Sequence, residues 1–159
     1  MSSRLALLES PKLTIAVRIA LGLIFVGASL PKIVDPPGFA HMIYNYRLVP
    51  GSLVNFVALV LPWLELLCGI ALTLGIWKRT AAGILGFLLV LFIVGLGVNL
   101  ARMHPIDCGC FDMSATGLTP PEQMLDMLWV MVRDLAMVAM ALQVFIGTWH
   151  ETETSATGQ

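Results

Sequence analysis

The chain has 159 residues, of which 58% are hydrophobic and 12% charged, and its mean hydropathy is +0.88. Soluble proteins carry about 25% charged and about 45–50% apolar residues, so this composition excludes an ordinary soluble domain and a disordered chain. The net charge of −1 excludes a basic surface for nucleic acid, and three cysteines are too few for a disulfide-stapled secreted scaffold. The sequence therefore predicts an all-α integral membrane protein, built as a single four-helix bundle over residues 1–150.

The first apolar segment, residues 13–33, is long enough to cross the bilayer as a helix, which takes about 20 residues. Arg18 lies inside it, and Pro31 and Lys32 come near its end. The basic flank and the small residues before Ser29 imitate a cleavable signal peptide. An arginine within the apolar core is unusual there, so we expect the segment to remain as a permanent helix.

The middle of the chain contains one short amphipathic segment and two further crossings. Residues 38–47 mix aromatic and polar side chains and are too short to span a membrane, which predicts a short helix at the interface. Residues 52–77 form the second predicted crossing, interrupted in hydropathy by Glu65, and residues 80–100 form the third. The very short connection between these two crossings predicts antiparallel neighbours.

The fourth helix is predicted over residues 120–149, after a polar loop at residues 101–118 and before a polar tail at residues 151–159. Its start has a clear signature. Thr119 is a candidate N-cap, Pro120 suits the first helical position, and Glu122 stands where a capping box places its acid.

Four crossings put both termini on one side of the membrane. Basic residues near that side slightly outnumber those near the other: Arg4, Lys12, Lys78 and Arg79 against Lys32, Arg47 and Arg102. Because cytoplasmic loops carry the excess of Lys and Arg, we expect cytoplasmic termini. The loop at residues 101–118 then lies on the outer, oxidising side, where disulfides form and persist.

Cys108-Gly109-Cys110 in this loop is the strongest chemical signal in the chain. In an extended chain, residues two apart are about 6.6–7.2 Å apart at Cα, just beyond the usual disulfide window of about 4.4–6.8 Å. Gly109 permits the bend that would close the gap, and the small ring would be strained and therefore oxidising. A clip around one residue gains little stability, so redox or metal chemistry is favoured over an inert clip.

Two neighbouring features bear on these thiols. Lys32 and Arg102 are predicted at the outer ends of their helices, where a cation favours the thiolate form, whereas Asp107 and Asp112 oppose it. His104 with Cys108 and Cys110 could also ligate a metal ion. Structural zinc sites usually have two separated ligand pairs and this loop has one, so metal binding stays the alternative.

Charged residues also lie within the predicted spans, at a cost of about 2.5–3.5 kcal/mol each at mid-helix: Arg18, Glu65, Arg133 and Asp134. Glu65 and Arg133 lie nearly level along their helices, which predicts an ion pair between the second and fourth helices, and Asp134 would be left to pair with Arg18. These charges either fix helix packing or form a polar wall that handles protons or holds a quinone headgroup.

Two polar or sulfur-containing residues receive structural interpretations. Asn99, at the outer end of the third helix, is expected to cap that end or anchor the loop. Cys68, deeper in the second helix, is expected to be a small buried filler.

Several segments together resemble the MauE/DoxX family of redox-associated integral membrane proteins, over about residues 17–135. The resemblance rests on Arg18 in RIALGLIFVGASLPKIVDPPGFA, on LPWLELLCG around Glu65, on NLARMHPIDCGCF and on VRDLAM. It implies a four-helix bundle in the bacterial inner membrane. It maps the family's cysteine pair onto Cys108 and Cys110, its acidic position onto Glu65, and its Arg-Asp pair onto Arg133 and Asp134. Asp112, after CGCF, departs from the family's usual CGCFG.

The resemblance also implies a role in thiol–disulfide redox outside the cytoplasm. Methylamine-utilisation members are associated with maturation of a disulfide-rich periplasmic dehydrogenase, beside a thioredoxin-like partner. Other DoxX relatives are linked to quinone-coupled oxidation of sulfur compounds or to oxidative-stress complexes.

The leading hypothesis is a thiol–disulfide oxidoreductase, or an accessory to one, in which Cys108 and Cys110 exchange disulfides with a thioredoxin-like periplasmic protein or a disulfide-containing client. Coupling to a membrane quinone is left open, as are the client, the direction of electron flow and the oligomeric state. Two alternatives remain: a metal- or metalloid-handling membrane protein, and a non-catalytic assembly subunit.

Overall fold

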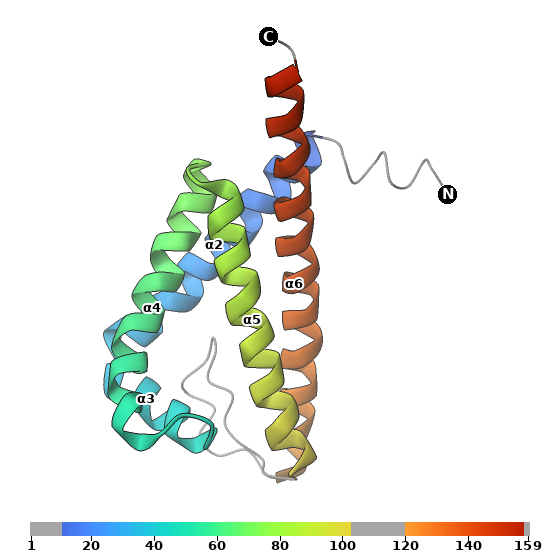
Figure 1. Cartoon of the computed structure of the whole chain (residues 1–159). Helices are drawn as coiled ribbons and strands as arrows, with labels where there is room; N and C mark the ends of the chain where they lie inside the picture. Colours follow the sequence, from blue (N-terminus) through green and yellow to red (C-terminus); the bar gives the residue numbers. More distant parts are fainter. Residues whose placement is uncertain (1–10, 103–119, 158–159) are drawn as a thin grey trace.

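The computed structural model describes residues 11–102 and 120–157, and within these ranges it contains helices and their connections only (Figure 1). The helices are α2 (Pro11–Val34), α3 (Pro36–Asn45), α4 (Gly51–Leu74), α5 (Lys78–Ala101) and α6 (Pro120–Thr157). Four of them contain stretches long and apolar enough to cross a membrane, at Lys12–Val34, Gly51–Leu74, Lys78–Ala101 and Leu125–Thr148. The predicted all-α fold of four membrane-crossing helices, with a short helix after the first, is confirmed.

Two helix ends differ by three residues or more from the sequence-based expectation. The second crossing ends at Leu74 and not at residue 77, because Gly75 adopts a left-handed conformation with φ of 80° and closes the helix. The fourth helix does not end at residue 149: α6 continues to Thr157, through much of the expected polar tail. Residues 150–157 contain no proline or glycine, and the first helix-breaking residue is Gly158.

The short helix α3 is held by its own start signals. Asp35 is its N-cap, and the Asp35 carboxylate accepts a hydrogen bond from the backbone N–H of Gly38 at 3.1 Å. Two prolines occupy the first turn, where a missing N–H costs nothing. Phe39 is buried and α3 packs on α4, so the helix predicted at the interface closes one end of the bundle.

The bundle consists of two close helix pairs, α2 with α4 and α5 with α6. Gly22 and Gly69 let α2 and α4 approach closely, since a Cβ added at Gly22 would lie 2.7 Å from the Gly69 carbonyl oxygen. In contrast, α4 and α5 meet mainly near their short connection and diverge toward the end that carries α3 (Figure 1). The backbones of α4 and α5 therefore separate toward α3 (Figure 1).

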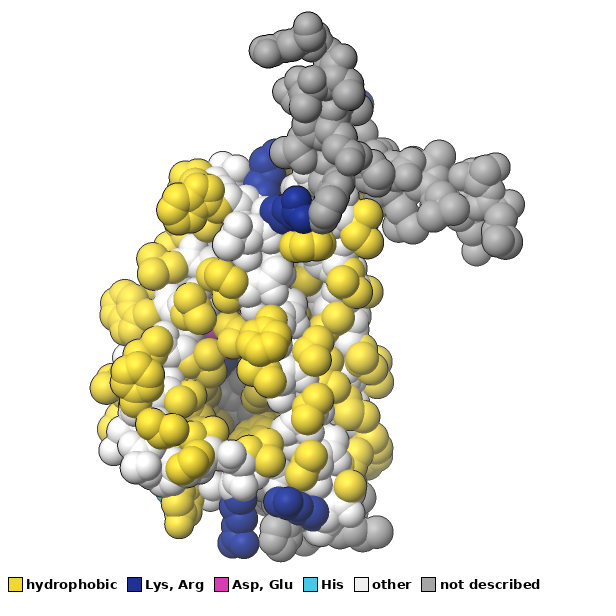
Figure 2. Space-filling model, viewed as in Figure 1, with side chains coloured by type: hydrophobic (Ala, Val, Ile, Leu, Met, Phe, Trp, Pro, Cys, Tyr) yellow, Lys and Arg dark blue, Asp and Glu magenta, His cyan; other side chains and the backbone are white. Residues whose placement is uncertain are grey.

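The outer surface suits a lipid environment. Figure 2 shows a broad band of hydrophobic side chains around the middle of the molecule, with Lys and Arg side chains at its two ends. Large apolar residues are exposed on the crossing helices, among them Leu67, Phe87 and Trp129. In water such a surface would be costly, whereas against lipid tails it is not.

Candidate functional site

The predicted redox residues Cys108 and Cys110, together with His104, lie outside the described residues. The chain that contains them joins the end of α5 to the start of α6, and both of these helix ends lie at the α3 end of the bundle (Figure 1). Arg102 is exposed at the C-terminal end of α5, as expected, and its backbone N–H bonds the Val98 carbonyl at 3.1 Å.

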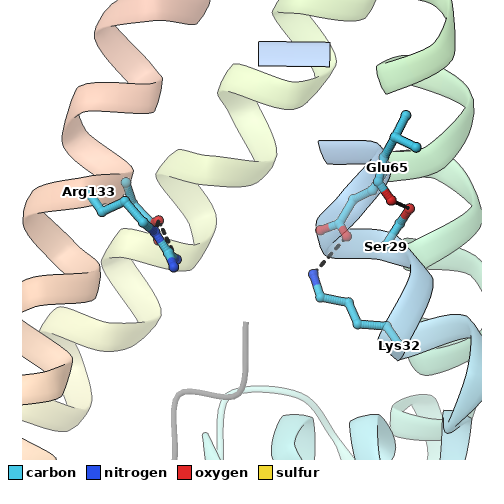
Figure 3. A network of polar contacts seen from close by, with 6 residues as sticks. Ser29, Lys32, Glu65 and Arg133 are labelled. Atoms are coloured by element: carbon cyan, nitrogen blue, oxygen red, sulfur yellow. Dashed lines mark hydrogen bonds and ion pairs between the residues drawn. The ribbon is translucent and has the colours of Figure 1, made fainter. Parts of the chain in front are cut away.

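A buried ion pair joins α2 and α4. The Lys32 ammonium donates a hydrogen bond to Oε2 of Glu65 at 2.7 Å, and the two side chains are only 8% and 9% exposed (Figure 3). The Lys32 nitrogen also lies 5.2 Å from the centre of the Phe39 ring, on α3. Taking two charges out of water is costly, and the short contact offsets part of that cost.

This pairing corrects two expectations. Glu65 was expected to pair with Arg133, but its partner is Lys32, because α2 packs closely on α4 whereas α6 packs mainly on α5. Lys32 was also expected to act as a cation that favours the thiolate form from the outer end of its helix, but it is buried and paired with Glu65. Helix α2 continues through Pro31 to Val34, and this keeps Lys32 on the helix and turned into the bundle.

A second charged pair lies on α6. Nε and Nη2 of Arg133 donate hydrogen bonds to Oδ1 of Asp134 at 3.1 and 2.9 Å. The Asp134 side chain is 2% exposed and that of Arg133 is 29% exposed. The Arg-Asp sequence therefore forms a local pair that supplies both a donor and an acceptor from one helix.

Arg18 does not pair with Asp134, which corrects a further expectation. Its guanidinium lies against Gly75, in the turn between α4 and α5. Because this turn is at the opposite end of the bundle from α3, Arg18 contributes nothing to the cavity described below.

Asn99 was expected to cap the third helix or anchor the loop, but its observed hydrogen bonds do neither. Its side-chain amide donates to the carbonyl of Tyr46 at 3.2 Å and to the carbonyl of Gly95 at 3.0 Å. Asn99 therefore fixes α5 to the end of α3. Cys68 is buried in α4 and forms no disulfide within the described residues, in agreement with the filler interpretation.

A cavity of about 360 Å³ lies between the two helix pairs, and both charged pairs line it. The rest of its wall is mostly apolar and includes Phe39, Met42 and Tyr46 of the α3 region, Leu61 of α4, and Leu88 and Phe92 of α5. Figure 2 shows a hollow on this face, rimmed by hydrophobic side chains.

The two charged pairs lie on opposite sides of this cavity. Figure 3 shows Lys32 and Glu65 on the α2 and α4 side and Arg133 on the α6 side, and all three line the cavity. The cavity thus combines apolar walls with two separate donor–acceptor pairs.

Sequence reasoning missed this cavity and the part that α3 plays in it. The amphipathic pattern of residues 38–47 gave the helix, but that pattern fits a membrane surface as well as a bundle wall. For the metal alternative, residues 11–102 and 120–157 contain no group of three His, Cys, Asp or Glu side chains able to hold an ion. The three proposed ligands lie outside these ranges.

Comparison with known proteins gives a consistent result. The family model described as methylamine utilisation protein MauE matches residues 10–149. Curated proteins called methylamine utilization protein MauE are similar to this chain. The one from Methylorubrum extorquens is 43% identical over 108 residues, covering 67% of this chain and 58% of that protein.

Two further relatives match over more of the chain. The protein from Methylophilus methylotrophus is 32% identical over 87% of this chain and 70% of its own length. The protein from Paracoccus denitrificans is 34% identical over 88% of this chain and 72% of its own length. No solved structure matches the chain.

Proposed function

The chain belongs to the MauE family, and from that premise we propose that it is a membrane accessory protein of methylamine utilisation that works by thiol–disulfide exchange through Cys108 and Cys110. The observation that carries the proposal is the Cys-Gly-Cys sequence in the connection between α5 and α6, whose two flanking helix ends lie at the α3 end of the bundle (Figure 1). Its electron-exchange partner is a soluble thioredoxin-like protein or a disulfide-containing client.

The exchange proceeds in two steps. A thiolate of the partner attacks one sulfur of the Cys108–Cys110 disulfide, the S–S bond breaks, and the released sulfur takes up a proton. A second partner thiolate then attacks the mixed disulfide and displaces the other cysteine, which is also protonated. The partner dithiol loses two electrons and two protons and becomes a disulfide, and Cys108 and Cys110 gain them. With the roles of the two proteins exchanged, the same steps run in reverse.

The distribution of charge supports an outer position for this loop, in the inner membrane of a bacterium. Because Lys32 is buried against Glu65, it is not a loop cation and leaves the count at the α3 end. Arg47 and Arg102 remain there, against Arg4, Lys12, Lys78 and Arg79 at the other end. The bias therefore favours cytoplasmic termini more strongly than the sequence count alone.

Capture of a mixed disulfide tests the proposal. In a Cys68→Ala background, Cys108→Ser and Cys110→Ser are made singly and together in a strain lacking the native gene. We expect one single variant to accumulate a reductant-sensitive adduct with an extracytoplasmic protein, because its resolving thiol is missing. The double variant is expected to form no adduct and to lose methylamine-dependent growth.

The controls separate this proposal from its alternatives. Cys68→Ala alone is expected to grow normally, because Cys68 is a small side chain buried in α4. Full growth of the double variant would contradict exchange and indicate an assembly subunit. Stoichiometric bound metal that is lost in Cys108→Ser, with no adduct in either single variant, would instead indicate metal handling.

A further inference from the structure

We propose that the cavity between the two helix pairs binds the ring of an isoprenoid quinone that enters from the bilayer. Its volume of about 360 Å³ lies within the range of about 300–1,000 Å³ that is typical of small-molecule sites. Such sites combine mainly apolar walls with a few convergent polar groups, and this cavity has both.

The position of the opening selects a lipid-soluble ligand. Leu91 of α5 lines the cavity and is also 52% exposed on the outer surface of the bundle. It lies in the middle of a span that crosses the membrane, so the surface that it reaches is the lipid-facing one. A ligand with a polar ring and a long apolar tail can leave its tail among the lipids while its ring enters the cavity.

The two charged pairs select a quinone among such ligands. A quinone ring has two carbonyl oxygens at opposite edges, each of which accepts a hydrogen bond. After reduction each oxygen becomes a hydroxyl, which donates one. The cavity offers a donor with an acceptor on one side, Lys32 with Glu65, and a second such pair on the other side, Arg133 with Asp134.

Lys32 has capacity for this additional contact. An ammonium group has three hydrogens, and in the described part of the chain its one hydrogen-bond partner is Glu65. The acyl chain of a phospholipid would fill the apolar part of the cavity but would leave this donor without a ligand partner. The Lys32–Glu65 pair therefore favours a ring that carries carbonyl groups.

Binding depends on the described residues alone, whereas its redox consequence rests on the proposed function. If Cys108 and Cys110 are oxidised by the bound quinone, the two thiols lose two electrons and two protons and form a disulfide. The quinone gains both electrons and both protons and leaves as the hydroquinone.

Photolabelling tests the site. The full-length protein, in nanodiscs of phosphatidylethanolamine and phosphatidylglycerol, is illuminated with an azido-ubiquinone. We expect label on the α4 and α5 peptides that contain Leu61 and Leu88, displaced by ubiquinone-2 but not by farnesol, an isoprenoid without the ring. Label that neither compound displaces, or that both displace equally, would overturn the proposal and leave a site for any apolar chain.

Two variants locate the interaction. The double variant Lys32→Met, Glu65→Leu removes one charged pair without leaving an unpaired charge, so the fold is expected to survive. Its affinity for ubiquinone-2 is expected to fall about tenfold or more, as for a lost hydrogen bond to a charged group. Leu91→Trp should narrow the opening and weaken labelling. Val90→Trp is the matched control, because Val90 is similarly exposed at 46% but does not line the cavity.

A cysteine-free loop separates this inference from the proposed function. The variant Cys108→Ser, Cys110→Ser is expected to bind ubiquinone-2 as the unmodified protein does. If no mixed disulfide is captured but displaceable labelling persists, exchange is wrong and the quinone site stands. Unchanged affinity in the Lys32→Met, Glu65→Leu variant would overturn the proposal that the Lys32–Glu65 pair contacts the quinone ring.

Discussion

At the scale of single residues, the proposed quinone contact depends on the buried pair of Lys32 and Glu65. Two charges at 2.7 Å inside a membrane bundle are tolerated because each neutralises the other. Neither could be assigned to the other from the sequence. Depth along separate helices placed Glu65 level with Arg133, but the actual pairing depends on which helices touch.

Removal of one partner of this pair should cost more than removal of both. Glu65→Leu leaves the Lys32 ammonium buried without its carboxylate, and we expect a loss of about 3–5 kcal/mol of stability. Adding Lys32→Met should recover most of it. Thermal unfolding of the purified variants in detergent measures the difference. If the double variant were less stable than Glu65→Leu alone, the pairing would be wrong.

Asn99 provides a second residue-level prediction. Asn99→Leu keeps the side chain's approximate size but removes its donor bonds to the carbonyls of Tyr46 and Gly95. We expect a loss of about 1–3 kcal/mol and faster amide hydrogen exchange at residues 46–49, because the end of α3 is no longer tied to α5. Asn55→Leu, on the exposed face of α4, serves as the control. Equal exchange in both variants would count against this anchor.

At the scale of elements, the crossing of α2 and α4 holds the two halves of the Lys32–Glu65 pair together. Close approach is possible because Gly22 and Gly69 have no side chains, and each would place a Cβ against the other's backbone. Not every helical glycine has this role, because Gly97 has open space around it.

Gly22 and Gly97 make a matched test of this close approach. Gly22→Ala should destabilise the bundle by about 1–3 kcal/mol, because the added methyl would lie 2.7 Å from the Gly69 carbonyl oxygen and the backbones must separate. Gly97→Ala should have little effect, since nothing lies within 4 Å of its added Cβ. Chemical denaturation of both variants in the same detergent checks this. Similar losses at the two positions would contradict the proposed crossing.

At the scale of the whole molecule, the sequence was sufficient for the fold class but not for the cavity. Four long apolar segments of high hydropathy leave little choice but four crossings, and the structure has them. The cavity arises from the unequal contacts between helices, and these depend on side-chain packing that hydropathy does not encode. Residues 38–47 illustrate the limit, because their pattern predicted the helix α3 but not that it would line the cavity.

The orientation of the whole bundle has its own test. Tyr44 on α3 and Thr80 in the first turn of α5 are exposed at opposite ends of the molecule. In a variant without Cys68, Cys108 and Cys110, we expect Tyr44→Cys to react with a membrane-impermeant maleimide on intact cells. Thr80→Cys should react only after the cells are broken. The reverse pattern would place the loop between α5 and α6 in the cytoplasm.

The central claim is that Cys108 and Cys110 change reversibly between dithiol and disulfide outside the cytoplasm. Its most direct measurement uses a Cys68→Ala variant, so that these two thiols are the only ones in the chain. Intact cells are treated with an impermeant mass-tagged maleimide, with and without prior reductant and during growth on methylamine. The account predicts no tag or two tags on each molecule, with two on nearly all after reduction and a mixture of both states during growth. Two tags under all conditions, or none even after reduction, would contradict it.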